Sequence, residues 1–382
     1  MTYDIFSSEH EQFRGQLRKF LSERVVPFSP EWEKNREIPR SIWREMGSMG
    51  FLGFCYDPAY GGLAVDDMFR VVMADEMGRS GCLGFAISVA VHNDMSTTYL
   101  NDLGTDEQKK RWLSPCVTGE AVCAIAITDP GAGSDVARIS MSAERRGDTY
   151  ILNGQKTFIT NGHYADVIIV AAKTDKGATP PQRGVSLFVV ERGTPGLSSR
   201  KLEKIGCHAS DTAEIFFDDV KVSDQNLLGK EGQGFYALMN KLQLERLIIS
   251  VIGLGAAQYA LDKAVTHARE RKAFGKTLTE FQVIRHRLAD IASQIEQSRA
   301  FAHYCATRFA KGDEIVKEIS MLKACSTEMV NRIAYDTTQI FGGYGYMAEY
   351  DVARLYGDIR SLSIIGGTTD IMREIIARRM GL

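Results

Sequence analysis

Residues 121–222 contain the runs AVCAIAIT (121–128), TYILNGQKTFIT (149–160), DVIIVAAKT (166–174), GVSLFVVE (184–191) and AEIFFDDVKV (213–222). These runs are rich in β-branched and aromatic residues, which favour strands, and turns that contain Gly, Asn or Pro separate them. No helical pattern lies between one run and the next, whereas a parallel sheet would need connecting helices. The sequence therefore predicts an antiparallel β-barrel or sandwich over residues 121–230.

Helical patterns lie on both sides of the predicted strands. Before residue 121, breaks that contain Gly or Pro divide the chain into about five helices, and Ser8 with Glu11 and Thr105 with Gln108 fit the capping-box pattern of helix starts. From residue 231 onward, apolar residues recur every three to four positions, as in a helical bundle. We therefore expect an α+β protein with a helical domain (1–120), a β-barrel domain (121–230) and a helical bundle (231–382).

The composition is that of an ordinary folded protein. The chain has 382 residues, of which 44% are hydrophobic, and its net charge of −2 excludes the basic footprint of a general nucleic-acid binder. The seven Cys include no CxxC pair, which disfavours a disulfide framework and a zinc ribbon, so we expect no metal site. The amino terminus lacks the apolar core of a signal peptide, and the longest apolar stretch, 247–257, is too short to span a bilayer. These features predict a cytoplasmic protein without membrane insertion.

Several common enzyme motifs are incomplete. The segment GKT (275–277) resembles the end of a P-loop, but Glu270 stands where the upstream Gly is required. The segment GLG (253–255) begins like a dinucleotide fingerprint, yet it lies inside a helical pattern and Gln258 occupies the third Gly position. A Rossmann-type dehydrogenase is therefore disfavoured.

Glu245 does not fit the apolar stripe of the predicted bundle. The other members of the stripe are Leu238, Leu242, Ile249, Ile252 and Ala256. Burial disfavours the charged form of a carboxyl group and raises its pKa, which suits a general base that removes a carbon-bound proton near neutral pH. Two structural explanations stay open: a core Glu paired with a buried Arg, and a stripe that reaches the helix edge.

Two Gly-rich loops are further candidate sites. The loop PGAGSD (130–135) follows a predicted strand, and its small residues allow backbone amides to approach an anion or a ring system. The loop FGGYG (341–345) lies between helices of the predicted bundle. Each loop is also compatible with a plain turn.

Six motifs resemble those of the acyl-CoA dehydrogenase family, in the family's order and over essentially the whole chain. They are ITDPGAGSD (127–135), NGQKTFITNG (153–162), LGKEGQG (228–234), ERKAFG (270–275), QIFGGYG (339–345) and GGTTDI (366–371). The resemblance implies the family's fold, with an N-terminal helical domain, a middle β-barrel and a C-terminal four-helix bundle. It also implies an FAD-dependent homotetramer in fatty acid β-oxidation, with acyl-CoA as substrate and an electron-transfer flavoprotein as electron acceptor.

The resemblance also implies contacts to FAD, residue by residue. Thr128 and Thr160 occupy the positions that hydrogen-bond the flavin ring, and Phe158 replaces a common aromatic residue that stacks on it. A neighbouring subunit would supply Arg271 and Phe274 to the pyrophosphate and adenine side. The expected FAD contacts are Ile125, Ile127, Thr128, Gly133, Ser134, Phe158, Thr160, Arg271, Phe274, Phe281, Gln282, Gln339, Gly342, Gly343, Thr368 and Asp370.

The last motif departs from the family's usual pattern. Many members carry the catalytic Glu directly before its Gly-Thr, where this chain has Gly366, whereas the long-chain and isovaleryl branches carry it at the position of Glu245. The resemblance thus implies that Glu245 takes the α-proton of an acyl-CoA while the β-hydrogen leaves as hydride to the flavin. A backbone amide near Gly366 would stabilise the thioester oxygen. Expected substrate contacts are Ser134, Leu242, Arg246, Gly366 and Gly367.

Other functions remain open from the sequence. Branched or alicyclic acyl-CoAs are alternative substrates, with Asp94 a weaker candidate base for an alicyclic ring. An acyl-CoA oxidase would use oxygen directly, and a decarboxylating glutaryl-CoA enzyme would need a cation in the acyl pocket, where only His92 is near. A non-catalytic acyl-CoA or flavin-binding protein, in which Glu245 is structural, is the alternative of another class.

Overall fold

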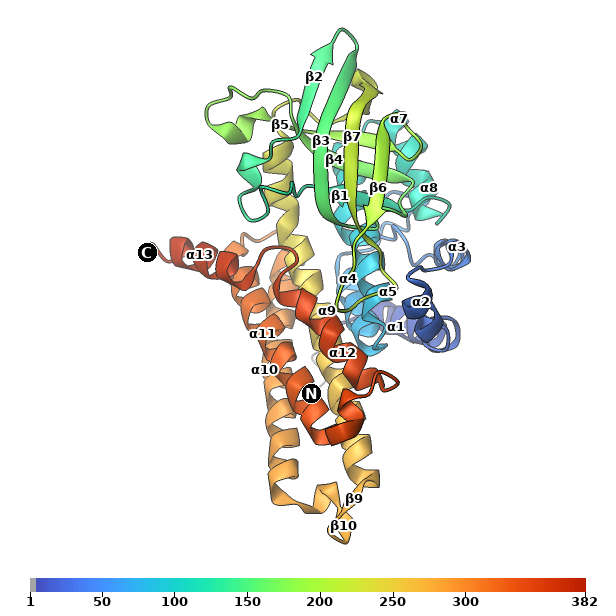
Figure 1. Cartoon of the computed structure of the whole chain (residues 1–382), viewed down its shortest axis with the longest axis vertical. Coiled ribbons are helices and arrows are strands. Elements are labelled where there is room, and N and C mark those ends of the chain that lie inside the picture. Colours follow the sequence, from blue (N-terminus) through green and yellow to red (C-terminus); the bar gives the residue numbers. More distant parts are fainter. Residues whose placement is uncertain (1–4) are drawn as a thin grey trace.

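The computed structural model describes residues 5–382. The molecule is elongated, with the strands at one end and long helices running from them to the opposite end (Figure 1). The N-terminal helices pack beside the upper part of the long helices, below the sheet. The order along the chain is α, then β, then α, as the sequence predicts.

The N-terminal part is helical. Its α-helices are α1 (Ser8–Phe20), α2 (Ser29–Asn35), α3 (Arg40–Ser48), α4 (Met68–Arg79), α5 (Leu83–Ala90), α6 (Thr97–Leu103), α7 (Asp106–Gln108) and α8 (Ser114–Val117). Wider π-helical turns join some of them into continuous rods; one of these turns, η3 (Val91–Ser96), connects α5 to α6. Every residue of α5 and η3 is buried, and α5 is apolar except for Ser88, whose hydroxyl donates to Oδ1 of Asn161.

The two predicted capping boxes differ in outcome. Thr105 and Gln108 form one, as predicted. At the first helix the cap is Ser7, not Ser8, and His10 takes the place expected for Glu11. His10 occupies the capping position because its ring contacts two partners at once. Its Nδ1 accepts from the backbone N–H of Ser7, and its Nε2 lies 3.0 Å from Oδ1 of Asp66.

The predicted strands form an eight-stranded sheet within the described residues. The strands are β1 (Cys123–Ala126), β2 (Ser142–Arg146), β3 (Thr149–Thr160), β4 (Val167–Lys173), β5 (Val185–Glu191), β6 (Leu197–Lys201), β7 (Thr212–Ser223) and β8 (Leu227–Leu228), in the order β6-β7-β3-β2-β4-β5-β8. Most pairs are antiparallel, but β4 pairs in parallel with β1, where Cys123 is opposite Val167, and with β2, where Ser142 is opposite Lys173. The purely antiparallel prediction was therefore wrong for the pairing of β4 with β1 and β2.

Alternate residues of β4 serve two separate cores, as the period of two in a strand requires. Val167, Ile169 and Ala171 pack in a core shared with the helices α6–α8 and α9, whereas Ile168 and Val170 face a core made by the other strands. The continuous run of apolar residues in this strand therefore reflects burial on both faces of the sheet.

The C-terminal part is the helical bundle. It comprises α9 (Gly234–Glu270), a hairpin of β9 (Lys272–Ala273) and β10 (Lys276–Thr277), then α10 (Gln282–Ala310), α11 (Val316–Phe341), α12 (Asp351–Arg360) and α13 (Thr369–Arg379). The hairpin forms the end of the molecule remote from the sheet, and α12 crosses in front of the long helices (Figure 1).

The helix α9 is the axis of the molecule, in contact with α4, α10 and α11. It is long and apolar enough to cross a membrane by length and composition, with an 18-residue window of mean hydropathy 1.3, which the sequence expectation of a short apolar stretch understated. However, 89% of that window is buried within the fold, and all residues from Leu244 to Ala257 are buried. Its apolar composition is that of a helix surrounded by other helices.

Candidate active site

Glu245 lies in the part of α9 that is buried on every side. The residue is 5% exposed, and Oη of Tyr99, from α6, donates a long hydrogen bond of 3.3 Å to its Oε1. Within residues 5–382, no Lys or Arg lies within ion-pair distance of its carboxylate. Glu245 is therefore not the core Glu–Arg pair that the sequence left open.

The surroundings of Glu245 change its acidity. Burial raises its pKa from the usual range to about 7, while the hydrogen bond from Tyr99 and the charges of Arg246 and Lys241 act in the opposite direction. A carboxyl group with this pKa is partly ionised near neutral pH, as a general base requires. Burial and the charge of Glu245 in turn raise the pKa of the Tyr99 phenol, which therefore stays protonated as a donor.

The turn of Gly366 and Gly367 packs against α9 at Arg246 and Ile249, which follow Glu245 in the same helix. Both residues have positive φ, +64° and +100°, which favours glycine. Nε of Arg246 donates to the carbonyl of Gly366 at 3.2 Å, and a Cβ on Gly366 would lie 2.7 Å from Cδ1 of Ile249. A side chain at position 366 would therefore meet Ile249, one helical turn beyond Glu245.

The sequence reasoning missed Lys323 of α11, which reaches the same turn. Lys323 is fully buried, and its Nζ donates to the carbonyl of Gly367 at 2.6 Å. Burial, with a contribution from the charge of Arg246, lowers its pKa to about 8. Lys323 interrupts the buried apolar positions of α11, which include Ile319, Leu322 and Val330. The argument that singled out Glu245 could therefore have identified Lys323 as well.

The loop after β1 is held by a buried ion pair. Lys156 of β3 is fully buried, and its Nζ bonds Oδ1 of Asp129 at 2.5 Å and the carbonyl of Ile127 at 2.7 Å. Asp129 also accepts from the backbone N–H groups of Ser140 and Met141. The backbone of Thr128 is tied to β3, because its carbonyl accepts from the N–H of Thr157 at 2.9 Å. These contacts therefore fix residues 127–129, from which the Gly-rich loop 130–135 begins.

Phe158 presents an aromatic ring beside this loop. It lies at an irregularity of β3, has φ of +60° and is 70% exposed, although it belongs to a strand that is otherwise largely buried. Such a backbone conformation is strained for a bulky residue, and strain of this kind gathers at functional sites. Thr160 and Ile125 are half-buried nearby in β3 and β1, whereas Gly133 and Ser134 are exposed at the tip of the loop.

Family models match three consecutive parts of the chain: "Acyl-CoA dehydrogenase, N-terminal domain" (7–120), "middle domain" (124–220) and "C-terminal domain" (232–381). The chain belongs to the acyl-CoA dehydrogenase family. Long-chain specific acyl-CoA dehydrogenase of Sus scrofa is 41% identical over 98% of this chain and 87% of its own length. Isovaleryl-CoA dehydrogenase of Pongo abelii is 36% identical over 97% and 88%. The crystal structure of acyl-CoA dehydrogenase from Geobacillus kaustophilus, 49% identical, covers both chains fully with a TM-score of 0.97.

Acyl-CoA dehydrogenases are FAD-dependent oxidoreductases that act on CH–CH donors, so this chain is a flavoprotein. Its glycines fit a bound cofactor. No protein atom other than Cγ2 of Thr128, at 4.0 Å, lies within 4 Å of a Cβ built on Gly131, Gly133, Gly342 or Gly343. Packing within the described chain therefore does not require glycine at these positions, and the free space beside them can take a ring or a phosphate group.

The expected FAD contacts of this acyl-CoA dehydrogenase fall into separate groups. Arg271, Gly342 and Gly343 line one cavity of about 560 Å³, whose other walls include His267 stacked on Phe341. Phe274, at the tip of the β9–β10 hairpin, is 96% exposed with φ of +52°, and Phe281 lies near it. Gln282 and Gln339 are exposed in the same region.

This hairpin group is far from the loop that follows β1. Arg271 lies 26 residues beyond Glu245, which corresponds to about 39 Å along a helix. The hairpin and the sheet are at opposite ends of the molecule (Figure 1). One chain therefore does not bring the two sets of predicted contacts together.

Thr368 and Asp370 line another cavity, of about 470 Å³, between α11 and the start of α13. The side chain of Thr368 accepts from the backbone N–H of Ile371 and so begins α13. Arg332, Arg360 and Arg373 also line this cavity, and no pattern in the sequence singled them out. Leu242, an expected substrate contact, is half-buried one turn before Glu245.

His92 and Asp94, which the sequence left as possible contributors, are both engaged elsewhere. The ring of His92 links two backbone groups: Nδ1 accepts from the N–H of Cys123, and Nε2 lies 3.2 Å from the carbonyl of Cys116. Burial lowers the pKa of His92 to about 4, so it is neutral at pH 7. Asp94 is buried rather than solvated and makes a 2.5 Å ion pair with Arg70 of α4.

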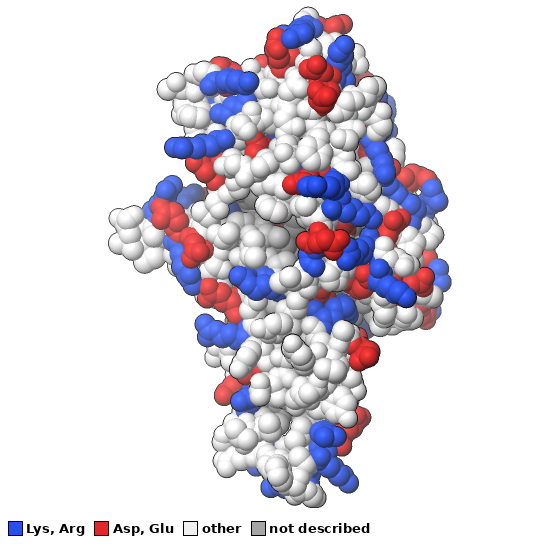
Figure 2. Space-filling view, viewed as in Figure 1, with Lys and Arg blue, Asp and Glu red and all other residues white. Residues whose placement is uncertain are grey.

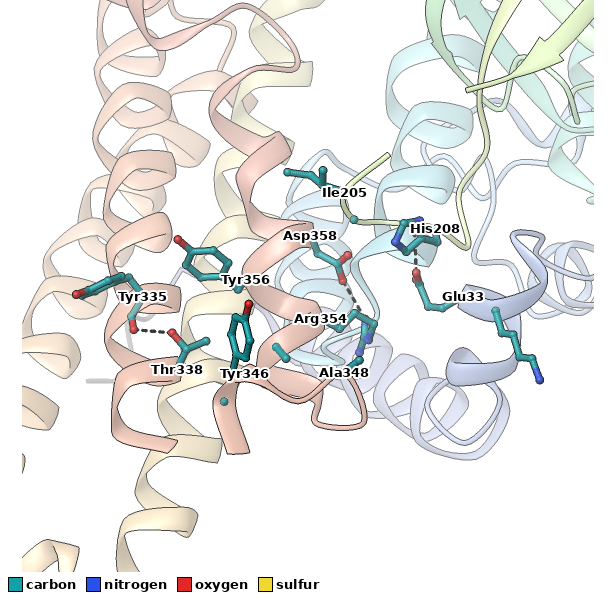
Figure 3. Close-up of a pocket in the computed structure, with 14 residues that line it drawn as sticks. Glu33, Ile205, His208, Tyr335, Thr338, Tyr346, Ala348, Arg354, Tyr356 and Asp358 are labelled. Carbon is teal, nitrogen blue, oxygen red and sulfur yellow. Dashed lines mark hydrogen bonds and ion pairs between the residues drawn. The ribbon is translucent and has the colours of Figure 1, made fainter. Parts of the chain in front are cut away.

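The cavity of about 690 Å³ shown in Figure 3 lies away from these residues. It lies between α2, the loop 205–208 and the helices α11 and α12, with Tyr335, Tyr346 and Tyr356 on one side and Glu33 and His208 on the other. Several of its lining residues are exposed apolar groups, including Ile205 at 78% and Tyr346 at 86%. Figure 2 shows the lower part of this face as largely uncharged. Among the described residues, no cluster of His, Cys, Asp and Glu could hold a metal ion.

Proposed function

We propose that this acyl-CoA dehydrogenase removes two hydrogens from the α and β carbons of an acyl-CoA thioester and forms a trans-2-enoyl-CoA. The observation that carries the proposal is Glu245, a carboxylate buried within α9 without an ion-pair partner among the described residues. Its raised pKa suits it to accept the α-proton. The Gly366 turn, which carries no competing carboxylate, packs against Ile249, one helical turn beyond Glu245.

Each part of the site has a proposed role. Glu245 takes the α-proton, and Tyr99 orients the carboxylate through its hydrogen bond. The backbone N–H groups of Gly366 and Gly367 donate no hydrogen bond within residues 5–382, so they are available to the thioester oxygen as negative charge develops there. FAD, held by the loop after β1 and by Phe158 and Thr160, supplies the acceptor for the hydride that leaves the β-carbon.

The proposed substrates are long straight-chain and branched acyl-CoAs. The support is the similarity to long-chain and isovaleryl-CoA dehydrogenases, with the higher identity to the long-chain enzyme. A Cβ on Gly366 would lie 2.7 Å from Cδ1 of Ile249, so the support for a branched substrate is the similarity to isovaleryl-CoA dehydrogenase and not free space beside the turn. His92 does not provide the cation that a glutaryl-CoA substrate would need, because it is neutral and both ring nitrogens have backbone partners.

The experiment is an anaerobic titration of the purified holoprotein, followed by the visible absorbance of the flavin. Straight-chain acyl-CoAs of increasing length, isovaleryl-CoA and a cyclohexane-type acyl-CoA are each added in turn. We expect stoichiometric bleaching with at least one group and identification of the enoyl-CoA product by mass. A flavin that none of these thioesters bleaches would contradict the proposal and favour a non-catalytic binding protein.

Glu245→Gln tests the assignment of the base. The amide has nearly the shape of the carboxylate but cannot accept the proton, so we expect FAD to stay bound while the rate of flavin reduction falls by about 10³-fold or more. Glu231→Gln, which changes a carboxylate whose Oε2 accepts from Tyr150 in the sheet domain, is the matched control and should keep the rate. Rapid bleaching by E245Q would remove Glu245 from the mechanism.

The proposed electron acceptor is an electron-transfer flavoprotein, by analogy with the family. A steady-state assay with that acceptor, with an artificial acceptor and with oxygen alone distinguishes the alternatives. Turnover with either acceptor and little peroxide is expected, whereas rapid peroxide formation would indicate an oxidase.

We also propose that the chain acts as a homotetramer in the cytoplasm. The separation of the hairpin contacts from the flavin loop supports assembly, because a second copy could bring its Arg271 and Gly343 to the cofactor held by the first. The exposed Tyr335, Tyr346 and Tyr356 beside the cavity of Figure 3 provide an aromatic face for such a contact. Light scattering of the purified holoprotein measures the assembly directly.

A further inference from the structure

Lys323 is a buried cation that the proposed reaction does not use. It is fully buried in α11, and no carboxylate among the described residues lies within ion-pair distance of its Nζ. Burying an ammonium group without a counter-ion is unfavourable, and such lysines are rare in protein interiors. A residue of this kind calls for an explanation in terms of what it binds, which here is the carbonyl of Gly367.

Arg246 makes the matching contact from the other side of the turn. Its Nε donates to the carbonyl of Gly366, while Nζ of Lys323 donates to that of Gly367. Two buried cations on different helices, α9 and α11, therefore hold two consecutive carbonyls. The neighbouring space is also restricted, because Cβ atoms on Gly366 and Gly367 would lie 2.7 Å from Ile249 and 2.8 Å from Met372.

The turn needs such anchors because it consists of glycines. Two consecutive glycines have many accessible backbone conformations, and no side chain restricts them. The observed φ values of +64° and +100° are only one pair among these. Hydrogen bonds to the two carbonyls fix the planes of the peptide groups and so fix the directions of the N–H groups that belong to them.

The same hydrogen bonds strengthen the N–H groups as donors. A cation that binds a peptide carbonyl polarises the whole peptide group and makes its N–H more positive. The peptide that Arg246 binds carries the N–H of Gly367, and the peptide that Lys323 binds carries the N–H of Thr368. Neither the N–H of Gly367 nor that of Thr368 donates a backbone hydrogen bond within the described chain, so the two polarised donors remain available.

We infer that Lys323 is a positioning residue for the dehydrogenation: it holds the Gly366–Gly367 turn so that the backbone N–H groups can stabilise the enolate-like oxygen of the thioester. The inference rests on the proposed function, because it assigns a role within the same site. Lys323 acts through the turn and does not itself contact the reacting atoms.

Lys323→Met and Lys323→Gln test the role in the holoprotein. Met keeps the length and removes both charge and donor, whereas Gln keeps a neutral donor. Ser326→Ala is the control on the same helix, because its buried hydroxyl makes no hydrogen bond and lies outside the proposed site. Flavin content and circular dichroism are recorded for each variant.

Two measurements are made on each variant. The first is the maximal rate of flavin reduction with the best acyl-CoA, together with its apparent Kd. The second is a pH titration of the long-wavelength charge-transfer band given by a 3-thiaacyl-CoA, which loses its α-proton in the site but cannot be dehydrogenated. This band reports the acidity of the bound thioester separately from hydride transfer.

For Lys323→Met, we expect the rate to fall by about tenfold, the Kd to change little and the apparent pKa of the bound analogue to rise by about one unit. Lys323→Gln should fall between Met and the wild type. A rate and an analogue pKa equal to those of Ser326→Ala in both variants would overturn the inference. If Lys323→Met yields no holoprotein, the same two readouts on Lys323→Gln decide it. A wild type that no acyl-CoA bleaches would instead overturn the proposed function.

Discussion

Glu245 destabilises the fold when it is ionised, because its carboxylate is buried. The pKa of the group is 4.5 in the unfolded chain and about 7 in the folded state. Between these values the folded state keeps a proton that the unfolded state has released, so a rise in pH favours unfolding. The destabilisation is absent below pH 4.5, grows between pH 4.5 and pH 7, and is complete above pH 7.

Glu245→Gln should therefore stabilise the protein in a pH-dependent way. We expect a gain on the order of 3 kcal/mol in the free energy of unfolding at pH 8 and a much smaller gain at pH 5. Thermal unfolding of wild type and variant at both pH values, with saturating FAD, measures the difference. An equal gain at the two pH values would show that packing, and not the titration of Glu245, is responsible.

As the hydrogen-bond donor to the proposed base, Tyr99 should set the lower end of the working pH range. Its hydrogen bond stabilises the ionised form of Glu245, so Tyr99→Phe removes an effect that lowers the pKa of this carboxyl group. We expect the midpoint of the rate of flavin reduction against pH to move upward by about one unit, with an unchanged plateau at high pH. Tyr60→Phe, which removes a hydrogen bond to Asp106 at the surface, is the control.

The sequence could predict single residues only where a polar group interrupts an apolar pattern. Glu245 was found in this way, and Lys323 could have been, because both occupy buried positions of long helices. Tyr99 carried no such signal, since tyrosines are common in buried helices. The partners of Asp94 and His92 come from α4 and from the strand β1, so inspection of their own helix could not reveal them.

At the scale of elements, the loop after β1 depends on the Lys156–Asp129 pair. Removal of one partner of a buried ion pair leaves an uncompensated charge, which typically costs about 3–5 kcal/mol. Lys156→Met should therefore lower the thermal stability and reduce the FAD retained on dilution, because the pair fixes the base of the loop that we propose holds FAD. The measurements are the melting temperature and the bound FAD after gel filtration.

The double variant Lys156→Met with Asp129→Asn is the control for this prediction. It removes the uncompensated charge but also the anchor of the loop, so stability should recover in part while FAD retention stays low. Recovery of both would show that Lys156 serves stability alone and not the position of the loop.

Local sequence patterns predicted the elements well and their pairing less well. Strand runs are recognised by β-branched residues, but the parallel pairing of β1 with β4 is a long-range choice that no local pattern encodes. The first capping box moved by one residue because His10 gains a bond to Asp66, 56 residues away. In both cases, contacts between residues far apart in the sequence determined the structure that forms.

At the scale of the whole molecule, the order of the three parts followed from composition, since strand-forming and helix-forming segments do not intermix. The arrangement of the residues expected to contact FAD could not be predicted from composition. Contacts that the family resemblance assigns to one FAD lie in distant parts of the molecule: Gly133 follows β1 of the sheet, whereas Gly343 lines a cavity with Arg271 beside the β9–β10 hairpin. The sheet and this hairpin are at opposite ends of the molecule (Figure 1). If both sets of residues contact one FAD, as we propose, the site must form between two copies.

Complementation between two variants tests this arrangement. Gly133→Leu and Gly343→Leu each fill space that holds almost no protein atoms, and neither glycine has positive φ, so each change should block FAD without disturbing the fold. Each variant alone should lose most of its FAD. A hybrid of the two places one intact loop opposite one intact hairpin region, so one of the two sites in a symmetric pair should regain FAD and activity.

The hybrid is made by co-expression with two different affinity tags and sequential purification. Gly15→Leu, on the exposed face of α1 where no atom lies within 4 Å of the added Cβ, is the control and should keep full FAD alone and in hybrids. Recovery of about half of the wild-type FAD content in the hybrid requires that residues of two subunits share each cofactor, because no chain in it carries both intact halves. A hybrid as poor in FAD as its parents would mean that each chain binds its cofactor by itself, and the assembly would then need another explanation.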